Sequence, residues 1–95
     1  MLENVELVNN CAYEPVELSS FTADVNKNSA VLNWSTSSER NNSGFDIERS
    51  EINGQWSKIG FVHGNVNSSS MNYYLFADRN LNSGKYKYRL KQIDY

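Results

Sequence analysis

Apolar and polar residues alternate along most of this chain, in short runs separated by turn-forming residues. A period of two is typical of a β-strand with one buried face. The last run, residues 85–95, shows it most clearly. One of its faces carries Tyr86, Tyr88, Leu90 and Gln92, and the other carries Lys85, Lys87, Arg89 and Lys91. The pattern predicts seven strands, at residues 2–8, 16–23, 30–34, 45–49, 56–62, 73–78 and 85–95.

Polar segments separate the predicted strands. Residues 35–44 and 64–70 are rich in serine and asparagine, and we expect both to be loops. Asn53 and Gly54 form the strongest hairpin signal, because this pair tolerates the positive φ angles of a two-residue turn. No helical period extends over a useful length. Short alternating strands with turn signals roughly every 8–12 residues predict an all-β, antiparallel β-sandwich.

Length and charge limit the classes of function. The chain has 95 residues, which suits one domain. Its net charge of -2 disfavours a nucleic-acid partner, because phosphate binding needs a clustered positive excess. Residues 1–10 lack the basic start and apolar run of a signal peptide. No segment has the length of apolar residues that a membrane span needs, so we expect no membrane insertion.

Cys11 is the single cysteine of the chain. An intrachain disulfide is therefore excluded, and the cysteine ligands of a zinc or iron–sulfur site are missing. Glycine-rich phosphate loops and calcium loops are also absent from the sequence, so we expect no metal and no cofactor. Cys11 is either a small spectator residue or the partner in an intermolecular disulfide.

A set of spaced residues resembles a known family. Its parts are Leu32-x-Trp34, Gly44-Phe45-x-Ile47, Tyr74-x-Phe76-x-Asp78-x-x-Leu81 and Tyr86-x-Tyr88-x-Leu90. This set resembles the fibronectin type III domain, an immunoglobulin-like antiparallel sandwich. The resemblance implies that Tyr86 is the tyrosine-corner residue, whose hydroxyl bonds back to the backbone. It also implies a core of Leu32, Trp34, Phe45, Ile47, Phe76, Leu81 and Tyr86.

More narrowly, residues 15–95 are similar to fibronectin-III-like modules near the ends of large proteins exported by the type IX secretion system. The similarity implies a secreted or cell-surface location. It divides the chain into residues 15–95, the sandwich with strands A to F, and residues 1–14, an extension with a short β-segment. Two departures from the family follow. The final strand G, which pairs with strand F, is missing, and the β-segment at residues 2–8 is additional.

The edge left open beside the last strand can be interpreted in three ways. The chain can be a fragment, an accessory spacer or adhesion module of a larger secreted protein. It can donate its first strand to a neighbouring copy and so form a filament subunit by strand complementation. It can also complete itself, but strand F needs an antiparallel partner, so residues 9–14 must stretch back over about 20 Å.

Donation between chains is the arrangement that we expect. Its donor residues are Val5, Leu7 and Val8. Its acceptor residues are Tyr86, Tyr88, Leu90 and Gln92. The partners are then other copies of the chain, joined head to tail.

Candidate catalytic residues have structural explanations. His63 is the only histidine and has no nucleophile motif beside it. Asp46 and Glu48 share a face as glycoside chemistry requires, but the fibronectin-like fold places them opposite Lys87 and Arg89 as cross-strand charge pairs. We therefore expect no enzymatic activity.

A weak carbohydrate affinity is the remaining functional expectation. Three aromatic residues have a strand phase that does not force them inward, and their rings could stack on a cell-surface glycan. They are Trp56, Tyr73 and Tyr95. Packing against a neighbouring chain explains them equally well.

Overall fold

The computed structural model describes residues 2–8, 16–51 and 54–95. Within these ranges the chain forms six strands and no helix, which confirms the prediction of an all-β protein. The described part has no helix that could cross a membrane. The strands are β1 (Leu2–Val8), β2 (Val16–Asn26), β3 (Ser29–Glu51), β4 (Ser57–Ser68), β5 (Asn72–Asp78) and β6 (Gly84–Asp94).

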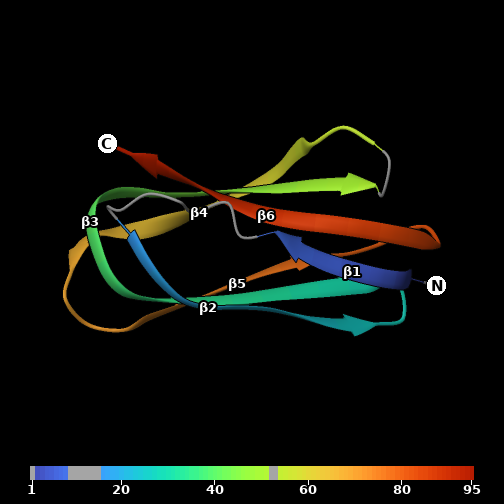
Figure 1. The fold of residues 1–95 in the computed structure, drawn as a ribbon, viewed down its shortest axis with the longest axis horizontal. Helices are drawn as coiled ribbons and strands as arrows, with labels where there is room; N and C mark the ends of the chain where they lie inside the picture. The colour runs from blue at the N-terminus through green and yellow to red at the C-terminus, as the bar shows by residue number, and fades with distance from the viewer. Residues whose placement is uncertain (1, 9–15, 52–53) are drawn as a thin grey trace.

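The long strand β3 organises the fold. Its first half pairs antiparallel with β2 and β5, and its second half pairs antiparallel with β4 and β6. Between the halves β3 bends, so that the sheet turns over into two layers (Figure 1). β1 lies against β6 at the end of the strand order β1-β6-β3-β2.

The polar segment at residues 35–44 belongs to β3, so the prediction of a loop there is wrong. The segment stays in the sheet because its inward polar side chains find hydrogen-bond partners in the interior. Thr36, Glu39 and Asn42 are all buried. The second predicted loop is also mostly strand, because β4 continues to Ser68.

Backbone conformation produces the bend. Asn41 has a φ of 56°, in the left-handed region that asparagine tolerates, and the pairing register shifts on both sides of Asn42. Gly44 allows the closest approach of β4: a Cβ there would lie 2.3 Å from the carbonyl oxygen of Val62. Opposite Asn42, Val66 has a φ of 57°, which is rare for a β-branched residue.

The core lies between the two layers. Of the residues that the family resemblance places in the core, six are buried and Phe76 is partly buried against them. The Trp34 ring contacts Phe45 from the other half of β3, edge to face at 5.6 Å, and stacks on Tyr74 of β5 at the same distance. Truncating a buried tryptophan of this kind would cost about 3–5 kcal/mol.

Candidate functional site

The edge of β6 is covered by β1 of the same chain. The two strands run parallel, with Val5 opposite Tyr86 and Leu7 opposite Tyr88. The expectation of an antiparallel partner for this strand is therefore wrong. The parallel direction carries the chain toward the bend of β3, where β2 begins with Val16 opposite Glu39, so no return along the domain is needed.

The ladder brings some of the expected assembly residues together and leaves others apart. Val8 lies opposite Arg89, where the ladder ends, so Leu90 and Gln92 are beyond it. Tyr86 and Tyr88 are buried. Gln92 instead donates a hydrogen bond of 3.0 Å to the side-chain oxygen of Asn42. The side chains of Val5, Leu7 and Val8 lie outside the described residues.

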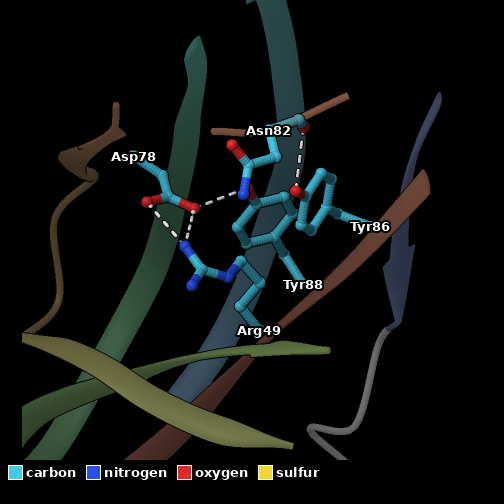
Figure 2. A network of polar contacts seen from close by, with 5 residues as sticks. All are labelled: Arg49, Asp78, Asn82, Tyr86 and Tyr88. Atoms are coloured by element: carbon cyan, nitrogen blue, oxygen red, sulfur yellow. Dashed lines mark hydrogen bonds and ion pairs between the residues drawn. The ribbon is translucent and has the colours of Figure 1, made fainter. Parts of the chain in front are cut away.

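A buried polar network joins the two layers through β6 (Figure 2). Both carboxylate oxygens of Asp78 accept hydrogen bonds from Nη1 of Arg49, at 2.9 and 2.8 Å. The hydroxyl of Tyr88 donates to Oδ2 of Asp78 at 2.6 Å. The neighbouring Tyr86 donates its hydroxyl proton to the backbone oxygen of Asn82 at 2.9 Å.

The charges of this network are mutually compensated. Burial lowers the pKa of Arg49, but the hydrogen bond and the charge of Asp78 together outweigh it and raise that pKa above its usual range. Burial, followed by the hydrogen bond to Asp78, raises the pKa of Tyr88 far above its usual value. The sequence pattern could have predicted that Arg49 and Asp78 face inward. Arg49 lies two positions after the core residue Ile47, and Asp78 lies two positions after Phe76.

A second polar cluster surrounds Glu39 at the bend of β3. Its carboxylate accepts hydrogen bonds from Thr36 Oγ1 at 2.7 Å, from Asn42 Nδ2 at 2.7 Å and from the backbone amide of Asn65 at 3.0 Å. The hydroxyl of Tyr74 also donates to it. Burial alone would raise the pKa of Glu39, but these four donors lower it below the ordinary 4.5. The sequence carried no signal for this cluster.

The same hydrogen bond affects Tyr74. Burial and the bond to Glu39 raise the pKa of its hydroxyl to about 12. That hydroxyl also accepts a hydrogen bond of 2.8 Å from the side-chain amide of Asn65 on β4. The cluster therefore ties β3, β4 and β5 together at one end of the molecule.

On the outer face of β3 the acidic residues form ion pairs with basic ones. Glu48 pairs with Arg89 at 2.6 Å, as the fold resemblance implied. Asp46 lies opposite Lys91 on β6, not Lys87, and its ion pair is made with Lys58 on β4 at 3.1 Å. Both carboxylates are thus neutralised by neighbouring strands.

The remaining candidate residues are dispersed. His63 is exposed and packs edge to face on Phe61 at 5.1 Å. The ring of Trp56 lies under the guanidinium of Arg89, 4.1 Å from its centroid, which occupies the face that a sugar would use. Tyr73 and Tyr95 are 77% and 73% exposed. Cys11 and Asn53 lie outside the described residues.

The buried carboxylates of the described residues are held in hydrogen bonds that join strands. A pocket of about 370 Å³ lies at the start of β2, between the bend of β3 and the end of β4. The buried carboxylate in its wall, Glu39, already accepts four hydrogen bonds and has a lowered pKa, so it is a poor general base. In residues 16–51 and 54–95, no three acidic, histidine or cysteine side chains are grouped as a metal ion would require.

Comparison with known proteins adds no relative: no family model, no curated protein and no solved structure matches the chain.

Proposed function

We propose that this chain is a non-enzymatic structural domain of an exported protein. It is a fibronectin type III-like sandwich whose open edge is filled by its own N-terminal strand. The observation that carries the proposal is the ladder between β1 and β6, because β1 lies where a strand G would lie. A strand edge with unpaired backbone groups invites aggregation, and this pairing covers it along residues 84–89.

Two features support the fibronectin-like assignment. The pairing of β2, the first half of β3 and β5 corresponds to strands A, B and E, and that of β4, the second half of β3 and β6 corresponds to strands C′, C and F. The hydroxyl of Tyr86 bonds back to Asn82, which is the contact of a tyrosine corner.

A structural role also accounts for the polar interior. The buried carboxylates of Glu39 and Asp78 each join side chains from different strands. Groups held in this way stabilise one arrangement of strands and leave no activated nucleophile or base. The domain then serves as a spacer or interaction module outside the cell.

Filament formation by strand donation is the second candidate, and the register of the same ladder is compatible with it. A β1 strand from a neighbouring copy would make the same backbone pairs with β6 that the chain's own β1 makes. Each copy would then donate one strand and receive one. Such a head-to-tail contact does not close into a ring, so it extends into a filament. The two candidates differ only in which chain supplies β1.

Disulfide trapping across the ladder distinguishes these candidates. Glu6 and Lys87 are direct partners, and adjacent strands lie about 4.8 Å apart, which a disulfide can bridge. We expect Glu6→Cys with Lys87→Cys, in a Cys11→Ser background, to form an intrachain disulfide at micromolar concentration. The measurement is non-reducing electrophoresis with mass spectrometry.

The matched control is Glu6→Cys with Lys91→Cys. Lys91 is four residues past Lys87, about 13 Å along the strand, so this pair should stay reduced. Interchain ladders from the Glu6/Lys87 pair would instead establish donation. Equal reactivity of both pairs, or of neither, would show that β1 does not occupy this edge.

A further inference from the structure

The outer edge of β5 is a second interaction surface, distinct from the β1–β6 edge. In the described part of the chain β5 pairs with β3 alone, so the backbone groups along its other side have no ladder. Two of its outward side chains are strongly exposed: Tyr73 at 77% and Leu75 at 60%. Tyr74 and Phe76, which point inward, are only partly buried because the sheet ends there.

β5 differs from the other edge strands in having no exposed charge. Residues 72–77 contain no acidic or basic residue, and Asp78 at the end of the strand is buried. By contrast, β2 carries exposed Glu17 and Asp24, and β4 carries exposed Lys58. Charged residues on an edge strand are a common protection against unwanted pairing. This edge lacks that protection and is apolar on its outward face.

We propose that two copies of the chain pair through β5, antiparallel about a two-fold axis at Leu75. In this register Leu75 faces Leu75 of the second copy, and Tyr74 faces Phe76. Tyr73 then lies opposite Ala77. Aromatic cross-strand pairs stabilise antiparallel ladders, and no like charges meet.

These three apolar or aromatic pairs make the edge complementary to itself, so the occupant that fits it is a second copy. The pairing would continue the layer of β2, the first half of β3 and β5 across the axis, over about 23 Å of paired strand. It covers Leu75 of both copies and the open flank of Phe76. Since β1 and β6 take no part, the contact is compatible with either source of the β1 strand.

Sedimentation velocity over a wide concentration range tests the association. We expect the wild-type chain to show a monomer–dimer equilibrium. Leu75→Glu should weaken the dimer by at least about 100-fold, because each copy loses a buried leucine and two carboxylates meet on the axis. Val25→Glu is the matched control, since Val25 is 47% exposed on β2, which β3 separates from β5; it should leave the dimer unchanged.

Disulfide trapping tests the register. In a Cys11→Ser background, Leu75→Cys should form an interchain disulfide, because residue 75 faces itself. Tyr73→Cys should not, because the two copies of residue 73 are offset by four residues, about 13 Å. A wild-type chain that stays monomeric at millimolar concentration, or equal trapping of both variants, overturns the proposal.

Discussion

At the scale of single residues, Glu39 shows how this fold uses polar side chains inside a β-sheet. A buried carboxylate without partners would keep its proton, and its pKa would rise. Four donors reverse that effect, and the pKa of Glu39 is lowered below 4.5. The ionised form therefore stabilises the folded state. Since the donors come from β3, β4 and β5, the hydrogen bonds of Glu39 hold these three strands together.

We expect Glu39→Gln to lower the free energy of unfolding at pH 7 by about 1–3 kcal/mol, because the new amide group faces existing donors. The pKa is lower in the folded than in the unfolded chain, so the contribution of the carboxylate is fully present above pH 4.5. It is lost as the pH falls through the folded pKa. Urea denaturation should show that the free energies of unfolding of Glu39→Gln and the wild type differ less at pH 3 than at pH 7.

Glu51→Gln provides the control, since Glu51 is exposed. It should change stability little at either pH. A gap between Glu39→Gln and wild type that is the same at both pH values would contradict the assigned role of the ionised carboxylate.

At the scale of elements, the bend of β3 depends on unusual backbone angles in two paired strands. Asn41 in β3 and Val66 in β4 both have left-handed φ angles. Asparagine adopts this conformation readily, whereas valine is strained there by roughly 1–2 kcal/mol. Val66 is also partly exposed, so its side chain contributes little to the core.

Val66→Asn should therefore raise the free energy of unfolding by about 0.5–1 kcal/mol, as measured by urea or thermal denaturation. The matched control is Val25→Asn, at an exposed valine of β2 outside the left-handed region. That change should be neutral or destabilising, because asparagine is a poor strand former. A loss of stability in Val66→Asn would show that the bend does not strain this residue.

The elements also show what the sequence could predict. Alternation revealed the strands around Trp34, Ile47 and Tyr88, because apolar side chains on one face report burial against an apolar core. It failed at Thr36 and Glu39, because side chains buried in a hydrogen-bonded cluster have the composition of a loop. The direction of β1 was also beyond prediction, because a period of two is the same when a strand is reversed.

At the scale of the whole molecule, β1 is joined to the fold mainly through one neighbour. Among the described strands it pairs with β6 alone, and it ends the strand order. Its pairing should therefore contribute strongly to the stability of the edge of β6 and little to the stability of the other strands. The network of Arg49, Asp78 and Tyr88 joins β6 to β3 and β5.

Removal of residues 1–8 tests this division. We expect the free energy of unfolding to fall by roughly 2–5 kcal/mol, because the hydrogen bonds of the ladder along residues 84–89 are lost. Hydrogen exchange followed by mass spectrometry should show faster exchange in residues 84–89. Residues 72–78, which in the described part of the chain pair with β3, serve as the internal control and should change less than residues 84–89. Unchanged exchange at residues 84–89 would contradict the assigned position of β1.

The parallel direction of β1 has a mechanical consequence. The start of β1 and the end of β6 lie toward opposite ends of the long axis (Figure 1). Tension between them pulls β1 toward Leu2 and β6 toward Asp94, along the ladder and in opposite senses. The load is then shear, in which all the hydrogen bonds of the ladder bear force together. A parallel strand at this edge thus lets the domain resist stretching, even though the pairing is short.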